Sequence, residues 1–240
     1  MIHLYQLYPD PETPDPSPFC FKVQFFLKYY DIKFTCHKIN VLKAPKKKAP
    51  YIYDDETSAI LCDSEDILTY LCSRFEIEPD KDLTPIQKAN AYCLRKMMEE
   101  YLYFIILFSR WGDQRGWDYI EPVYFKEIPP FIRRFITPMI RRSIVKAMYG
   151  QGVGRHSHEE IYKRGEEIFP HLETILTSKK FFMGQEISMV DFTAFPFLYA
   201  NLLFPYRSPL YPIISQQENL VRYVDTLANK FYPAPKFPTP

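Results

Sequence analysis

The sequence predicts a mixed α/β unit at the amino end of the chain, followed by a part that contains helices only. Two observations support this fold class. Within about the first 75 residues, short runs of β-branched and aromatic residues alternate with two segments of helical spacing. After residue 84, apolar residues recur at helical spacing only. We therefore expect two domains, an α/β domain over residues 1–76 and an all-helical domain over residues 84–240.

The composition is that of a folded chain. Of its 240 residues, 47% are apolar and 25% are charged, which excludes a disordered chain. The net charge of +1 gives no electrostatic reason to expect a nucleic-acid partner. Only 7 residues are glycine, and neither common glycine-rich phosphate-binding pattern occurs. The longest apolar run, Tyr101–Phe108, is far shorter than the roughly 18 residues of a membrane-spanning helix.

The cysteines and the amino end predict a cytoplasmic location. The chain has 5 cysteines, an odd number, and no Cys-x-x-Cys pattern, which argues against a disulfide framework or a zinc site. The first residues have neither the basic start nor the apolar stretch of a signal peptide. His156 and His158 form a His-x-His pair, but no third ligand is evident, so we expect no metal.

The first elements follow from local signals. The aromatic and aliphatic run Ile2–Tyr8 predicts a strand. The segment Pro9–Pro16 has too many prolines for a helix or a central strand, so we expect an extended loop. Ser17 followed by Pro18 is typical of a helix start, and helical spacing follows. Lys33–Ile39 then predicts a second strand.

The rest of the α/β unit contains two short strands and a helix. Both strands are expected within Pro50–Cys62, around a turn at Asp54–Ser58. Asp63 or Ser64 caps the helix that follows, whose apolar residues continue to Phe75. The element order is therefore β-α-β-β-β-α, with a connection before the third strand.

The second part of the chain is predicted from helix starts. Capping boxes open three helices, at Thr84–Gln87, Ser157–Glu160 and Ser188–Asp191. The first of these is long and becomes apolar on all sides at Tyr101–Phe108, as a buried helix does. We also expect a proline-broken helical region at 130–149, a last helix near 216–231 and an extended tail at 232–240.

Three ordered features carry a family resemblance. They are Ser17-Pro18-Phe19-Cys20 at a helix start, Ala49-Pro50 before a strand, and Asp63-Ser64 at the next helix start. With an all-helical second half, this set resembles the cytosolic glutathione transferases, whose first domain has the thioredoxin-like fold. More narrowly, these segments and residues 110–117 and 152–162 look like the failed axon connections branch, which is related to the metaxins.

The resemblance implies that Ser17 is the catalytic residue. A helix amino end carries partial positive charge and lowers the pKa of a thiol placed against it. The Ser17 hydroxyl would donate to the thiolate of glutathione, the implied co-substrate. Related proteins that form mixed disulfides have cysteine here, so serine favours thiolate stabilisation. The alternative is that Ser17 only caps the helix. Cys20, without a first cysteine as partner, is expected in the core.

The resemblance also implies a binding site for glutathione. Pro50 corresponds to the cis-proline of the fold, and the backbone of Ala49 would pair with the cysteinyl part of the tripeptide. Ser64 would hold the γ-glutamyl carboxylate at a helix amino end, and Asp63 would accept from the γ-glutamyl amine. Lys48 would pair with the glycyl carboxylate, or it belongs to a solvated turn.

Two functions are compatible with this pattern. One is a glutathione S-transferase that attacks a small hydrophobic electrophile, as in detoxification. The other is a non-catalytic binding or docking module that keeps the fold, as the kinship with metaxins suggests. Family resemblance also implies a possible homodimer. The electrophile has no linear signature, because an acceptor pocket built from scattered aromatic side chains leaves none.

Overall fold

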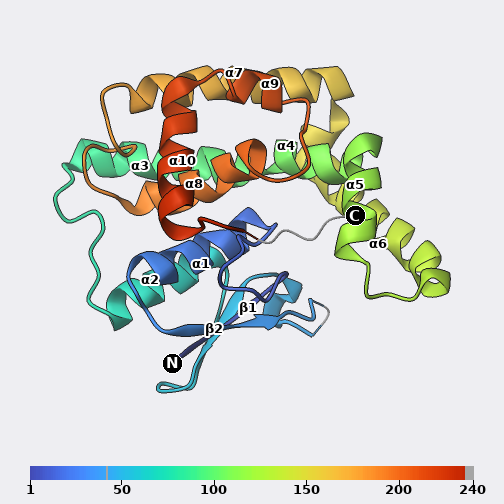
Figure 1. Ribbon diagram of the computed structural model, residues 1–240, viewed down its shortest axis with the longest axis horizontal. Coiled ribbons are helices and arrows are strands. Elements are labelled where there is room, and N and C mark those ends of the chain that lie inside the picture. The colour runs from blue at the N-terminus through green and yellow to red at the C-terminus, as the bar shows by residue number, and fades with distance from the viewer. Residues whose placement is uncertain (42, 236–240) are drawn as a thin grey trace. The chain divides into compact units, whose positions relative to one another are not determined.

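The computed structural model describes residues 1–41 and 43–235, and these residues form two compact units (Figure 1). The first unit contains residues 1–95, residues 178–200 and the segment that starts at Arg222. The second unit contains residues 96–177 and 201–221. The segments around 190 and 225 therefore cluster with the sheet, although they follow the helical region in sequence. The predicted boundary between residues 76 and 84 stays a prediction.

A four-stranded mixed sheet forms the base of the first unit. Its strands are β1 (Ile2–Gln6), β2 (Phe34–Lys38), β3 (Tyr51–Asp54) and β4 (Ala59–Cys62), in the order β2-β1-β3-β4. β1 pairs with β2 in parallel, and the other two pairs are antiparallel. The predicted strands are confirmed, and β1 and β2 are slightly shorter than the runs that predicted them.

Helices α1 (Pro18–Tyr29) and α2 (Ser64–Arg74) lie on the same side of this sheet (Figure 1). They bury alternate strand residues such as Leu4 and Ile52, both 0% exposed. Burial of one strand face by helices is the main source of stability in such a layer. Both helix starts lie where the sequence predicts them, with Ser17 and Asp63 as the N-cap residues.

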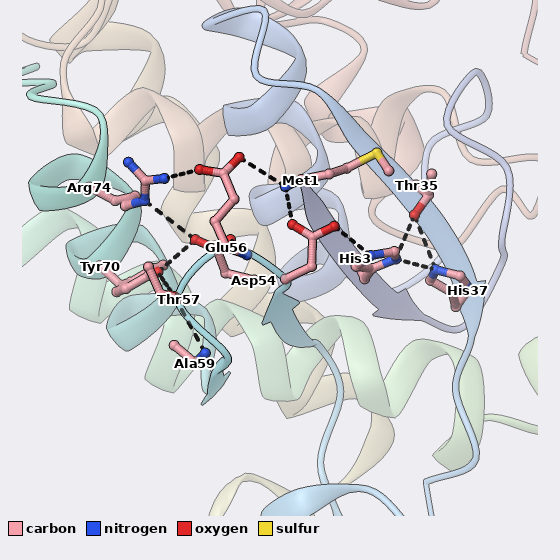
Figure 2. Close-up of polar contacts among 11 residues, drawn as sticks. Met1, His3, Thr35, His37, Asp54, Glu56, Thr57, Ala59, Tyr70 and Arg74 are labelled. Atoms are coloured by element: carbon pink, nitrogen blue, oxygen red, sulfur yellow. Dashed lines mark hydrogen bonds and ion pairs between the residues drawn. The ribbon is translucent and has the colours of Figure 1, made fainter.

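The carboxyl end of α2 is tied to the β3–β4 turn by a polar network (Figure 2). The Asp54 carboxylate is 1% exposed and accepts a 2.7 Å hydrogen bond from the Tyr70 hydroxyl. The Arg74 guanidinium lies 3.5 Å from the same carboxylate and also pairs with Glu56. Because a buried carboxylate needs such partners, this network fixes α2 on the sheet and thereby positions Ser64 at its other end.

The opposite face of the sheet is half-exposed. It carries a row of aromatic and histidine side chains from three strands: His3, Tyr5, His37, Tyr51 and Tyr53. The connection between β2 and β3 contains one short turn of helix, Pro45–Lys47, and within the described residues no longer helix covers this face. Tyr5 and Tyr51 stack with ring centroids 4.3 Å apart. Stacking between neighbouring strands stabilises the sheet in the absence of a covering layer.

Three further helices complete the first unit: α3 (Pro85–Met97), most of α8 (Met189–Leu202) and α10 (Glu218–Phe231). Aromatic side chains join α8 to α1. Phe25 of α1 lies 4.7 Å from Phe195 of α8, and Phe21 lies 5.3 Å from the same ring, measured between centroids. All three rings are at most 1% exposed, so α8 is part of the same core as α1.

The second unit is helical. It consists of α4 (Tyr103–Leu107), α5 (Gln114–Tyr124), α6 (Pro130–Gln151), α7 (His158–Leu176) and the short α9 (Tyr211–Ile214), with one short helical turn at Val153–Arg155. The predicted long helix from Pro85 continues to Gly112, with wide π-type turns at Met98–Leu102 and Phe108–Gly112. The capping box at Ser157 is confirmed, whereas α5 and α9 were not predicted.

The prediction of a proline-broken region at 130–149 is wrong. α6 runs without interruption through Pro138. The Pro138 side chain is exposed, and the preceding Thr137 hydroxyl donates a 3.0 Å hydrogen bond to the Arg133 carbonyl one turn earlier, so the helical turn continues past the proline. In the tail, residues 236–240 of the predicted extended segment lie outside the described residues.

Candidate functional site

Strand register brings the candidate site residues to one edge of the sheet. Tyr51, the first residue of β3, pairs with Tyr5 near the end of β1 and with Cys62 at the end of β4. Ala49 and Pro50 therefore lie beside the residues that follow β1 and beside Asp63-Ser64. Both α1 and α2 begin at this edge, so two helix amino ends, each with partial positive charge, lie there.

Ser17 is the N-cap of α1. Its hydroxyl accepts a long hydrogen bond of 3.5 Å from the amide of Cys20, and its carbonyl accepts from Phe21 in the first helical turn. The side chain is half-buried. Because the hydroxyl acts as an acceptor in this contact, it can still donate its proton, either to the neighbouring Cys20 sulfur or to an anion such as a thiolate.

Asp15 is a site residue that the sequence analysis missed. Its carboxylate is 4% exposed and accepts hydrogen bonds from the amides of Tyr8, at 2.7 Å, and Ser17, at 2.8 Å. It thus joins Tyr8, two residues after the end of β1, to the N-cap of α1. The signal was available, because an aspartate that accepts from the amide two residues later forms a common Asx turn.

The proline-rich loop forms a fixed wall beside Ser17. The Gln24 amide, on α1 and 0% exposed, donates to the carbonyl oxygens of Asp10 at 2.8 Å and Thr13 at 3.1 Å. The Lys28 ammonium contacts the Pro11 carbonyl at 3.3 Å. These contacts bind the loop to α1 at several points. The loop therefore forms one wall of the site and is not a cover that opens and closes over it.

Because its carboxyl is buried, Asp15 should make the free energy of unfolding depend on pH. Burial raises the pKa of Asp15 to about 7 from 3.8, although the amides of Tyr8 and Ser17 act in the opposite direction. A carboxyl with a raised pKa binds its proton more tightly in the folded state, so the free energy of unfolding falls as pH rises from about 4 to 7. We expect Asp15→Asn to make this fall shallower.

Thermal unfolding of the two proteins between pH 4 and 8 tests this expectation. Burial also raises the pKa of Asp191, to about 6, so the parent chain has two contributors to the slope. The contribution of Asp15 is therefore the difference between the pH dependence of stability of the parent and that of the variant. Parallel curves for both proteins would show that Asp15 does not titrate in this range.

Asp63 and Ser64 open α2 in a strained backbone conformation. Asp63 has a φ of 83°, in the region that non-glycine residues rarely adopt, and its side chain accepts from the Glu65 amide at 3.1 Å. Strain of this kind persists where surrounding structure enforces it and is concentrated at functional sites. Ser64 is 4% exposed, and its hydroxyl has no hydrogen-bond partner in the described part of the chain. A hydroxyl without a protein partner, on a residue that is otherwise buried, suits a polar ligand.

The Ala49-Pro50 peptide bond is cis, as predicted for Pro50. Ala49 is half-buried and Pro50 is buried. Lys48 is exposed, whereas Lys46 lies 3.6 Å from the Asp66 carboxylate on α2. Lys48 therefore keeps its charge available at this edge, while Lys46 faces the first turn of α2.

Glu65 fixes the first turn of α2. Its carboxylate lies 3.2 Å from the Lys22 ammonium of α1, a side chain that is 0% exposed, and 2.5 Å from the Arg95 guanidinium of α3. A buried ammonium requires an acid partner, so this contact is strongly specified. Glu65 thereby holds Ser64 beside α1, a role that no local pattern of residues predicts.

Cys20 is buried in the core, as the sequence predicts. It is 0% exposed, and burial raises the pKa of its thiol well above the ordinary value, with the Asp15 charge acting in the same direction. A thiol in this state is a poor nucleophile. The geometry therefore offers Ser17, and not Cys20, as the group that faces a ligand.

Within residues 1–41 and 43–235, no group of three or more histidine, cysteine, aspartate or glutamate side chains is arranged to hold a metal ion. Among these same residues, no helix combines the length and hydropathy that crossing a membrane requires.

Family models match both parts of the chain. The model of the glutathione S-transferase N-terminal domain matches residues 18–116, and that of the glutathione S-transferase C-terminal domain matches residues 165–227. Together they cover about two thirds of the chain. The first match contains Ala49-Pro50 and Asp63-Ser64, and begins one residue after Ser17.

Characterised relatives are of two kinds. Isoprene-epoxide--glutathione S-transferase from Rhodococcus sp. is 28% identical, over 96% of this chain and 99% of that protein. Failed axon connections from Drosophila melanogaster is 27% identical over 97% of this chain, and Metaxin-1 from Macaca fascicularis is 24% identical over 82%. The chain spans 58% and 64% of those two proteins. The resemblance to the failed axon connections and metaxin branch is confirmed.

Solved structures show the same architecture. The beta-etherase LigF from Sphingobium sp. is similar with a TM-score of 0.67 at 15% identity, over 95% of this chain and 94% of that one. The glutathione transferase YghU from Streptococcus pneumoniae, solved with glutathione, has a TM-score of 0.58 at 16% identity, over 95% of this chain and 78% of that one. The predicted fold, a thioredoxin-like domain followed by helices, is confirmed.

Proposed function

The chain belongs to the glutathione S-transferase superfamily, and from this premise we propose that it binds glutathione and stabilises its thiolate for attack on a small hydrophobic electrophile. The observation that carries the proposal is the meeting, at one sheet edge, of Ser17, the Ala49 backbone and the Ser64 hydroxyl, which is unpaired among the described residues. A thiolate and a carboxylate in one ligand match the two helix amino ends at that edge.

Each site residue has a task in this proposal. The Ser17 hydroxyl donates to the glutathione sulfur. The Ala49 backbone pairs with the cysteinyl residue, and Lys48 attracts the glycyl carboxylate. Ser64 donates to the γ-glutamyl carboxylate, while Asp63 accepts from the γ-glutamyl amine. Once the sulfur is held as a thiolate, its lone pair attacks the electrophile, and the leaving group or opened ring takes the electron pair.

An epoxide is the electrophile class that we favour. The support is the relative named for isoprene epoxide, which aligns over almost the whole of both chains. A cytoplasmic location, a detoxifying role and a homodimer belong to the same proposal.

A second function has support of its own. Failed axon connections is 27% identical to this chain, against 28% for the transferase, and Metaxin-1 is 24% identical over a shorter part of it. The alternative is therefore a glutathione-transferase fold that serves as a binding or docking module without turnover. Glutathione binding without conversion of epoxides or other standard electrophiles favours this alternative.

Replacing Ser64 with alanine should weaken glutathione binding about 10- to 100-fold. The γ-glutamyl carboxylate would lose a donor worth about 1.5–3 kcal/mol. Isothermal titration calorimetry of glutathione with the parent and variant measures the effect. Ser208→Ala removes another buried serine hydroxyl, in the helical unit, and should leave the affinity unchanged. Equal affinities for the parent and Ser64→Ala would remove Ser64 from the site.

A further inference from the structure

Helix α6 has an unusual charge composition. Its 22 residues, Pro130–Gln151, contain five basic side chains and no acidic one, although the whole chain has a net charge of only +1. The basic residues are Arg133, Arg134, Arg141, Arg142 and Lys146. The positive charge is therefore local to this helix.

The same helix exposes large apolar side chains. Of the 13 such side chains exposed in the described part of the chain, six lie on α6. Phe131, Phe135 and Met139 are 69%, 66% and 67% exposed. Residues four apart lie on one face of a helix, so these three form a continuous apolar ridge. Scattered exposed apolar residues need no explanation, but a ridge of this kind indicates an interaction surface.

The other face of α6 is docked within its own unit. Met148 is 1% exposed, and Arg141 donates hydrogen bonds to the carbonyl oxygens of Trp111 at 2.8 Å and Gly112 at 3.2 Å. Arg133 lies 3.3 Å from the Glu121 carboxylate on α5. These contacts set the rotation of the helix about its axis and leave the ridge facing solvent.

The remaining basic side chains lie along the ridge. Arg134, Arg142 and Lys146 are exposed, and none has an acidic partner among the residues that the structure describes. The Arg134 guanidinium lies 5.0 Å from the centre of the Phe135 ring. Arg142 and Lys146 are three and seven residues after Met139 and thus continue the same face. The surface therefore combines an apolar ridge with free positive charge.

We propose that α6 docks this protein on the surface of an anionic lipid bilayer. The apolar ridge would enter the boundary between headgroups and acyl chains, and the three free cations would contact lipid phosphates and carboxylates. A bilayer supplies uniform negative charge above an apolar layer, which complements a helix without a single acidic residue. An acidic protein partner would match the same positive charge, but it would not supply the apolar layer that the ridge needs. The helix lies on the surface and does not span it.

Vesicle flotation tests the proposal with the full chain. We expect binding to phosphatidylcholine vesicles that contain phosphatidylserine, little binding to pure phosphatidylcholine, and release as salt rises. The triple variant Phe131→Ser, Phe135→Ser, Met139→Ser should lose binding about tenfold or more, and so should Arg134→Gln, Arg142→Gln, Lys146→Gln. All six side chains are exposed, so both variants should keep the parent circular dichroism spectrum and glutathione affinity.

Matched controls change side chains of the same kind elsewhere. Ile86→Ser removes an apolar side chain that is 68% exposed on α3, and Lys179→Gln, Lys180→Gln removes two other cations. Both should bind vesicles like the parent. The proposal is wrong if the parent binds vesicles equally with and without phosphatidylserine, or if the ridge variant binds them as well as the parent. It is also wrong if light scattering shows that the ridge holds two copies of the chain together and the parent does not bind vesicles.

Discussion

Replacing Ser17 with alanine should abolish the thiolate form of bound glutathione at neutral pH while leaving the fold intact. The amino end of α1 attracts the sulfur in either case, but only the Ser17 hydroxyl supplies a directed donor. Without it, the pKa of the bound thiol should rise toward the ordinary thiol value of about 8.5. Loss of one preorganised donor to a developing or full negative charge typically costs about 100-fold in rate.

The fold should tolerate this change because the hydroxyl contributes little to capping. Its hydrogen bond from the Cys20 amide is 3.5 Å long, and Asp15 holds the Ser17 backbone independently through the 2.8 Å contact to its amide. The expected loss of stability is at most about 1 kcal/mol. Function and folding can therefore be separated at this residue.

The ultraviolet absorbance of bound thiolate, recorded against pH, measures the effect directly. Ser157→Ala provides the matched control, since it removes an N-cap serine with a complete capping box from α7. That variant should lose stability and keep the thiolate signal. If the thiolate absorbance of Ser17→Ala were the same as that of the parent, Ser17 would be only a helix cap, and the docking function would become the better explanation.

Sequence reasoning succeeded where the physical cause is local. The start of α1 was predictable because Ser17 and Pro18 favour a helix start through their own geometry. The two strands around the Asp54–Ser58 turn were also predictable from local signals, because short runs rich in aromatic and aliphatic residues favour strands and the polar residues between them favour a turn. The conformation of the Ala49-Pro50 bond came from the resemblance and is confirmed.

Features that depend on distant partners were not predictable. Glu65 is specified by Lys22 and Arg95, which lie 43 and 30 residues away along the chain. For Asp15, the turn to Ser17 was a local signal, but its burial and its contact with the Tyr8 amide depend on the fold. We predicted a broken helix at Pro138 because proline disrupts the helix around it. In the structure, packing of the opposite face holds α6 together.

Replacing Asp191 with alanine should cause the largest loss of stability of any change considered for this protein. The Asp191 side chain is 0% exposed and lies in the first turn of α8. Its carboxylate accepts from the Ser188 amide at 2.9 Å, the Phe182 amide at 3.0 Å and the Tyr223 hydroxyl at 3.2 Å. It therefore joins the preceding loop, α8 and α10 through one buried group.

Alanine would leave these donors buried and unpaired. Each such group costs about 1–3 kcal/mol, and the helix would also lose its cap. A total of about 3–5 kcal/mol is a large part of the roughly 5–15 kcal/mol that stabilises a typical folded chain. We expect a large fall in the urea midpoint and poor recovery of folded protein at 37 °C.

Two further variants separate the causes. Asp191→Asn keeps one acceptor and adds a donor, so it should lose less stability than alanine, and it removes the contribution of a carboxyl whose pKa burial raises to about 6. Asp225→Ala changes an exposed aspartate on α10 and should have almost no effect. If alanine and asparagine destabilised the protein equally, the carboxylate hydrogen bonds would not be what joins α8 to the preceding loop and to α10. Because α8 shares its core with α1, a loosened α8 should also disturb Ser17, so glutathione affinity should fall together with stability in Asp191→Ala.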